Sequence, residues 1–161
     1  MSETWTIEQF RAYQKNGKPY PKATVRPRKT LLKKADTEFS LLMRATEADK
    51  NGVVKCCTCG KRMPWKGTGE AHWGHWQSRG FNGVRFNPVN GGVQCRVCNT
   101  YLEGRKEDMK KYLIQRYGET EVLRIEAFSR ISTKITNPEL EEMAAKFRDQ
   151  ANRITKEKNL K

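Results

Sequence analysis

Hydrophobic positions along the chain follow a helical period at both ends and lose it in the middle. The first end predicts a helix over 4–14 and a second that opens at Asp36 or Thr37 and stops near Asn51-Gly52. The other end predicts helices over 106–116, 120–131 and about 137–156, with Asn137-Pro138 as the cap and first-turn pair of the last. We therefore expect helices at both ends of the chain and a middle segment without helical periodicity.

The middle segment, 53–103, has the composition of short strands and turns. It contains all five cysteines, both histidines, three of the four tryptophans and eight of the twelve glycines. The sequence therefore predicts an α+β fold in three parts: residues 1–52, a core over 53–105, and C-terminal helices over 106–161. At 161 residues with 36% hydrophobic residues, the chain supports one modest core, which a covalent or metal staple would help to stabilise.

Basic residues are concentrated between the first two predicted helices. Residues 15–34 are rich in lysine, arginine and proline, and we interpret them as an extended basic arm. The formal net charge is +14 and the pI about 9.8, which makes a polyanion such as DNA the first partner to consider. The candidate DNA contacts from this arm are Lys22, Arg26, Arg28 and Lys29.

The sequence contains no apolar run near the roughly 20 residues that cross a bilayer, and its first residues do not resemble a signal peptide. We therefore expect a cytoplasmic protein without a membrane partner, whose thiols stay reduced. Five cysteines in such a compartment favour metal ligation over disulfides.

Two C-x-x-C pairs, Cys56/Cys59 and Cys95/Cys98, predict a structural zinc site. This spacing lets two thiolates from one tight turn reach a tetrahedral ion at about 2.3 Å. Cys57 is then a bystander thiol, although it could replace Cys56 as a ligand.

A rival partition would join Cys56 and Cys59 to His72 and His75 in a two-Cys, two-His finger. The histidines are separated by only two residues, and prolines and glycines occupy the stretch that should form the finger's helix. The rival also leaves the second cysteine pair without a function. We therefore rank it second, and the two histidines remain available for chemistry, since imidazole can accept a proton from water near neutral pH.

The motifs around these histidines resemble the HNH nuclease pattern and, more narrowly, the phage NinG/Rap recombination proteins. The likeness runs from about Val54 to Ala127. The residues that carry it are Cys56/Cys59/Gly60, Gly74/His75, Arg85-Phe86-Asn87/Asn90, Gln94-Cys95/Val97-Cys98-Asn99 and Gly104.

The resemblance implies a ββα-metal core in which His75 is the general base, Asn90 orients the imidazole or the loop, and Asn99 binds the catalytic metal. His72 stands where we expect an Asp ligand, three residues before the base. The resemblance implies Mg²⁺ or Mn²⁺; an imidazole in place of a carboxylate favours Mn²⁺, Ni²⁺ or Zn²⁺ over Mg²⁺, unless Glu70 supplies the carboxylate. A metal site made of both histidines is the remaining alternative.

The function implied is a metal-dependent endonuclease acting on branched DNA, such as Holliday junctions or D-loops, in a bacterial host cell if the protein comes from a phage. Arg79, Arg85 and Arg96 flank the motif and could grip phosphates, although solvated charges are nearly as plausible. A homodimer through the final helix would allow symmetric cutting. The competing hypotheses are a non-catalytic zinc-ribbon module that binds DNA or acts as a scaffold, and an RNA-directed protein.

Overall fold

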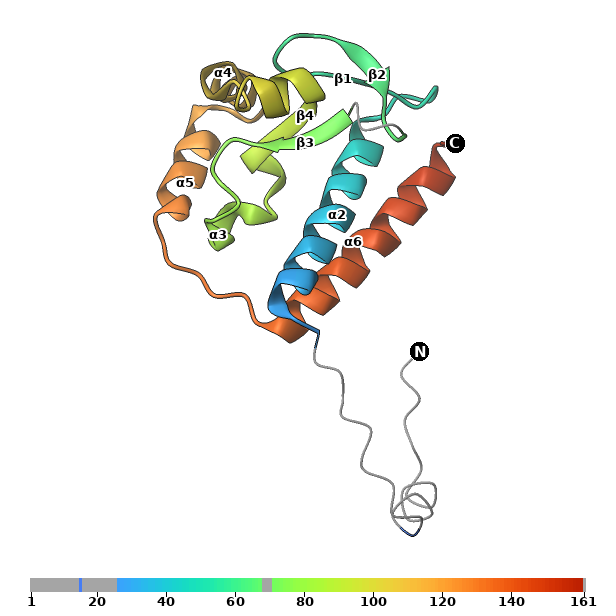
Figure 1. Ribbon diagram of the computed structural model, residues 1–161. Coiled ribbons are helices and arrows are strands. Elements are labelled where there is room, and N and C mark those ends of the chain that lie inside the picture. Colours follow the sequence, from blue (N-terminus) through green and yellow to red (C-terminus); the bar gives the residue numbers. More distant parts are fainter. Residues whose placement is uncertain (1–14, 16–25, 68–70, 161) are drawn as a thin grey trace.

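The computed structural model describes residue 15, residues 26–67 and residues 71–160, as an α+β arrangement (Figure 1). Two small hairpins and several helical segments follow one another along the chain. The elements are α2 (Arg28–Glu47), β1 (Val53–Lys55), β2 (Arg62–Pro64), β3 (Ala71–His75), α3 (Asn82–Arg85), η1 (Pro88–Asn90), β4 (Gly91–Cys95), η2 (Val97–Tyr101), α4 (Lys106–Tyr117), α5 (Glu119–Ser129) and α6 (Asn137–Glu157). The α+β class predicted from the sequence is confirmed.

The hairpin of β3 and β4 lies at the centre of the molecule. Figure 1 places it between the α2–α6 pair on one side and α4 with α5 on the other. The strands are antiparallel, with His72 opposite Gln94 and Gly74 opposite Gly92. Because side chains alternate along a strand, His72 and Gly74 share one face with Gln94, whereas Trp73 and His75 share the other.

The face that carries Trp73 packs against α2. The Phe39 ring meets the Trp73 ring edge-on, with centroids 5.9 Å apart, and Phe39 is only 2% exposed. Burial of a phenylalanine to this degree stabilises the fold by about 1.5–3 kcal/mol. Trp73 and Trp76 are both buried.

The prediction of an extended arm is wrong from Arg28 onward, because α2 begins there rather than near Asp36. Leu31 and Ala35 are buried together with Leu140 and Ala144 of α6, so this stretch, basic as it is, carries a helical apolar face. Asp36 is consequently mid-helix and does not cap it. Residues 16–25 of the arm and the helix predicted over 4–14 lie outside the described residues.

The C-terminal helices agree with the sequence prediction to within a residue or two. Helix α4 ends at Tyr117 before Gly118, whose φ of 86° suits a residue without a side chain. Helix α6 has Thr136 as its cap rather than Asn137: the Thr136 hydroxyl accepts from the Glu139 N–H, and the Glu139 carboxylate accepts from the Thr136 N–H.

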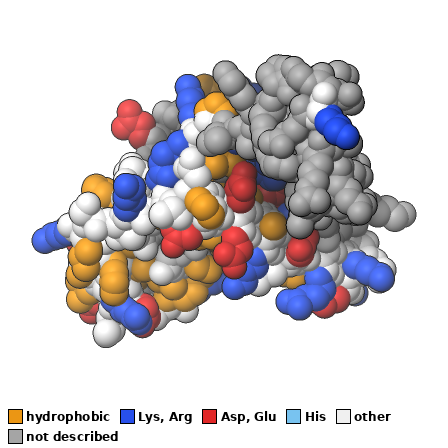
Figure 2. Space-filling view, turned by 90° about the horizontal axis from the view of Figure 1, so that it is seen from below, with side chains coloured by type: hydrophobic (Ala, Val, Ile, Leu, Met, Phe, Trp, Pro, Cys, Tyr) orange, Lys and Arg blue, Asp and Glu red, His pale blue; other side chains and the backbone are white. Residues whose placement is uncertain are grey.

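The apolar stripe of α6 faces α2, which covers it within the same chain. Exposed apolar residues gather instead around α5, where Leu123, Phe128 and Ile131 are 42–55% exposed. Figure 2 shows hydrophobic side chains grouped on that side of the molecule. The predicted dimer through the final helix stays a prediction. Among the described residues, no helix is both long and apolar enough to cross a bilayer.

Candidate functional site

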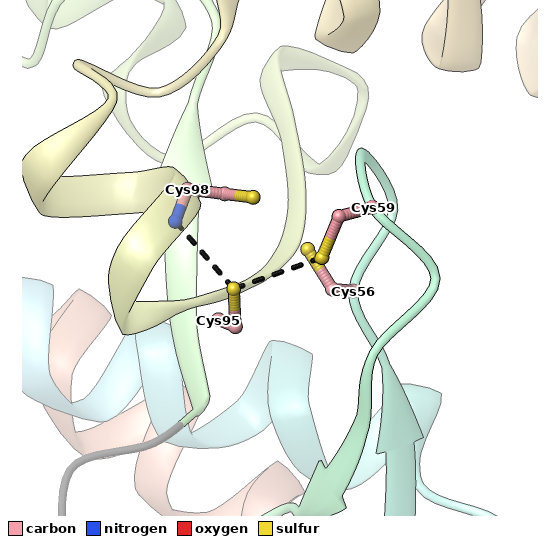
Figure 3. A group of neighbouring side chains, drawn as sticks. All are labelled: Cys56, Cys59, Cys95 and Cys98. Atoms are coloured by element: carbon pink, nitrogen blue, oxygen red, sulfur yellow. Dashed lines mark hydrogen bonds between the residues drawn. The ribbon is translucent and has the colours of Figure 1, made fainter.

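The four cysteines of the two C-x-x-C pairs come together as predicted. Their sulfur atoms all lie within 4.8 Å of one another, and three of the four residues are buried. Cys56 and Cys59 come from the turn after β1, whereas Cys95 ends β4 and Cys98 lies in η2; Figure 3 shows the four side chains converging. The two turns are thereby clamped together.

The spacing of the sulfurs fits a tetrahedral zinc ion. Four sulfurs at about 2.3 Å from one centre stand about 3.8 Å apart, and the Cys59 and Cys95 sulfurs are 3.8 Å apart. The cluster contains neither histidine, and His72 instead contacts Asn99. The described residues therefore form a four-cysteine group that could hold a structural metal such as zinc, and the two-Cys, two-His partition is not the one adopted.

The surroundings of Cys56 and Cys59 shift the pKa values of their thiols in opposite directions. Burial opposes ionisation of Cys56, but hydrogen bonds from the Thr58 hydroxyl and from nearby backbone N–H groups lower its pKa to about 6. A backbone hydrogen bond from Lys61 also lowers the pKa of Cys59, yet burial and hydrogen bonds with the other thiols raise it to about 12. Cys56 is therefore easier to ionise than Cys59, and a bound cation would favour the thiolate form of both.

Cys57 is separate from this cluster. Its sulfur lies 3.6 Å from the sulfur of Met109, and burial raises the pKa of its thiol, which keeps it neutral. The interpretation of Cys57 as a bystander fits these surroundings.

His72 and Asn99 are brought together across the hairpin. The Asn99 side-chain amide lies 3.2 Å from Nδ1 of His72, and both side chains are partly exposed. Asn99 sits in the π-helical turn η2 that follows β4 directly, rather than in a regular α-helix. These two predicted metal ligands therefore occupy one face of the hairpin.

His75 ends β3 on the opposite face. Its Nε2 lies 2.9 Å from the carbonyl oxygen of Arg85, which can only accept, so Nε2 carries the proton and Nδ1 keeps its lone pair. Burial lowers the pKa of His75 to about 4. The imidazole is thus neutral at physiological pH, with an unprotonated Nδ1.

Asn90 is fully buried and holds the loop that follows β3. Its Oδ1 accepts from the Gln77 N–H at 2.8 Å, and its Nδ2 donates to the carbonyl oxygens of Gln77 and Val84. All three bonds reach backbone groups. The surroundings of Asn90 therefore match the loop-orienting part of its predicted role.

The flanking arginines differ in their surroundings. Arg85 makes a bidentate pair with Asp36 of α2, at 2.6 and 2.8 Å, and only 13% of its side chain is exposed. Arg79 also reaches Asp36, at 3.7 Å, but is 62% exposed, and Arg96 is exposed beside the Tyr101 ring. Arg79 and Arg96 are accessible to a phosphate as they stand, whereas Arg85 is held inside the fold.

The predicted contacts of the N-terminal part are only partly described. Arg28 donates to the Ile135 carbonyl at 2.6 Å, which ties the start of α2 to the start of α6. Arg26 and Lys29 are exposed. Lys22 and Glu70 lie outside the described residues.

Two site residues were missed by the interpretation of the sequence. Lys106 donates through Nζ to the carbonyl oxygens of His75 and Trp76, and fixes the end of β3 to α4. Gln94 is completely buried beside Gly74 and Asn99. Strand alternation could have identified Gln94, since it stands opposite His72.

The sequence was compared with known families and proteins. No curated protein and no solved structure matches it. The sequence model of one family, described as Bacteriophage Lambda NinG protein, matches residues 6–157, which is nearly the whole chain. The chain therefore belongs to the bacteriophage lambda NinG protein family.

Proposed function

We propose that the protein is a metal-dependent endonuclease of the HNH type that hydrolyses phosphodiester bonds in branched DNA. The observation that carries the proposal is the arrangement around β3 and β4: a neutral His75 ends one strand, a buried Asn90 fixes the adjoining loop, and Asn99 follows the other strand. A hairpin followed by a helical turn that bears an amide ligand is the order that a ββα-metal site needs.

Hydrolysis needs an activated water and a group that stabilises the leaving oxygen. His75 supplies the first, since its protonated Nε2 is anchored on Arg85 and Nδ1 is left to take a proton from water. Asn99 and His72, which lie side by side, would hold a divalent cation that would supply the second as a Lewis acid. His75 is the last residue of β3 and lies on the face opposite His72 and Asn99, so the proposal requires the substrate phosphate to lie across the end of this strand.

The charge of the protein supports DNA as its substrate. Its net charge of +14 favours phosphate contacts through counterion release, and Arg79 and Arg96 are exposed next to the site. Membership of a phage family associated with recombination favours branched intermediates, such as Holliday junctions, over linear duplex.

The test is Mn²⁺-dependent cleavage of supercoiled plasmid and of a four-way junction by the wild type, His75→Ala and Thr100→Ala. Thr100 is an exposed neighbour of Asn99 and serves as the matched control. We expect His75→Ala to lose cleavage by at least about 100-fold with zinc content and unfolding temperature retained, and Thr100→Ala to cut normally. DNA binding without cleavage by the wild type, with any divalent metal, would favour the non-catalytic zinc-ribbon module instead.

A further inference from the structure

Gln94 is a polar side chain with no exposed surface in the middle of the candidate site. Its Nε2 donates to the Gly104 carbonyl oxygen at 2.8 Å and to the Thr58 hydroxyl at 3.3 Å. A carbonyl oxygen only accepts, so these bonds fix which end of the amide faces Gly104. Oε1 therefore points the other way, where it has no hydrogen-bond partner among the residues that the structure describes.

Oε1 of Gln94 points onto Gly74 and toward Asn99. A Cβ atom on Gly74 would lie 2.1 Å from Oε1 of Gln94 and 3.1 Å from Oδ1 of Asn99. Two amide oxygens thus converge on the same small volume above this glycine, and no larger residue fits there without displacing Gln94. The other end of the Asn99 amide is engaged with His72.

Two acceptor oxygens cannot satisfy each other. A buried acceptor left without a donor is destabilising, and facing acceptors also repel. A cation between them removes both costs, and amide oxygens are ligands that Mg²⁺, Mn²⁺ and Ca²⁺ accept at about 2.0–2.6 Å.

We propose that Oε1 of Gln94 and Oδ1 of Asn99 are paired oxygen ligands of a divalent cation bound above Gly74. The catalytic role of this cation rests on the proposed function, but the binding of the cation does not. Gln94 also supplies an oxygen where His72 replaces the expected carboxylate, so the site keeps a preference for Mn²⁺ and Mg²⁺.

The cysteine cluster holds Gln94 in this orientation. The Thr58 hydroxyl accepts from Nε2 of Gln94 and lies 3.3 Å from the sulfur of Cys56. Gly104, the second partner of Nε2, lies just beyond η2 and donates its own N–H to the Cys98 carbonyl at 2.8 Å. Both partners of the amide thus belong to segments fixed by the four cysteines, so the ligand oxygen is preorganised.

The test is a titration of the zinc-loaded full chain with Mn²⁺ in the absence of DNA. The electron paramagnetic resonance signal of free Mn²⁺ measures how much of the ion remains unbound. The test variant is Gln94→Met, which keeps the length of the side chain but has no oxygen. Gln115→Met, at an exposed position of α4, is the matched control. Zinc content and thermal unfolding show that each variant is folded.

We expect Gln94→Met to raise the Mn²⁺ dissociation constant about tenfold or more, and Gln115→Met to leave it unchanged. Gly74→Ala should act like Gln94→Met, because its new Cβ displaces Oε1. The inference is overturned if the wild type binds no Mn²⁺, or if Gln94→Met binds it normally, since the amide is then only a structural hydrogen-bond partner.

The two proposals can fail separately. If Mn²⁺ binding follows the expected order but no DNA is cut, the cation site stands and the endonuclease proposal fails. If DNA is cut and Gln94→Met needs no more Mn²⁺ for half-maximal cleavage than the wild type, the endonuclease stands and Gln94 is not a ligand.

Discussion

The pair of Asp36 and Arg85 should contribute more to stability than the other ion pairs among the described residues. The two side chains are only 16% and 13% exposed and share two hydrogen bonds of 2.6 and 2.8 Å. They also join α2 to the segment whose carbonyl oxygen anchors His75. Removal of one partner of such a pair leaves the other charge desolvated, which costs about 3 kcal/mol.

For a domain of this length, a loss of 3 kcal/mol corresponds to a fall of about 6–12 °C in the unfolding temperature. We expect this fall for Asp36→Ala and for Arg85→Met in the zinc-loaded protein, measured by circular dichroism. Arg153→Met is the control, because the Arg153–Glu157 pair is 69% and 64% exposed at 3.8 Å and should contribute well under 1 kcal/mol.

A double-mutant cycle separates the pair from the individual side chains. Asp36→Ala combined with Arg85→Met should cost far less than the sum of the single changes, with a coupling of about 1.5 kcal/mol or more. Additive single effects, or a loss no larger than that of Arg153→Met, would refute the claim that this partly buried pair anchors α2 to the site.

Three other predictions follow from the cysteines, His75 and the N-terminal residues. Cys95→Ser should release zinc, measured with a chromogenic chelator, and unfold the hairpin, whereas Cys57→Ser should keep both; equal zinc content in the two variants would contradict the assignment. The pKa of His75 falls from 6.5 to about 4 on folding, so between pH 6.5 and pH 4 the unfolded chain binds more protons than the folded one. The contribution of the neutral His75 to stability is therefore present above pH 6.5 and is lost as the pH falls. Denaturant unfolding should therefore show that the free energy of unfolding of the wild type is about 2 kcal/mol lower at pH 5 than at pH 7, and that His75→Asn lacks this decrease. The same decrease in His75→Asn would rule out His75 as its source. Deletion of residues 1–25 removes Arg11, Lys15, Lys18 and Lys22 without entering α2, and should reduce the slope of log K against log salt by up to about 3 to 4; an unchanged slope would show that these residues do not contact phosphates.

Local patterns in the sequence were enough to predict several parts of the structure. The C-x-x-C spacing predicted the sulfur cluster because a tight turn brings both thiols of a pair to one side. Helix α6 was predicted because its apolar stripe and its start signals lie in one stretch of sequence.

Other features depend on contacts between distant segments, and the sequence did not reveal them. The start of α2 was missed because Leu31 and Ala35 are few among many basic residues, and residues of α6, over a hundred positions later, help to bury them. The bidentate contact of Arg85 with Asp36 spans 49 positions, and no local pattern distinguishes it from a solvated charge.

The order of residues in β4 and η2 makes the candidate divalent-cation site depend on the cysteine site, but not the reverse. Alternation along β4 turns Gln94 to one face and Cys95 to the other, and η2 then returns Cys98 toward the sulfurs and Asn99 toward His72. If the sulfurs hold zinc, they clamp the turn that aims both amide oxygens, but these oxygens fix none of the sulfurs. Chelation of zinc should therefore abolish Mn²⁺ binding, whereas Gln94→Met should leave zinc content unchanged. Mn²⁺ binding at wild-type affinity by zinc-free protein would show that the amide oxygens are held by the hairpin alone.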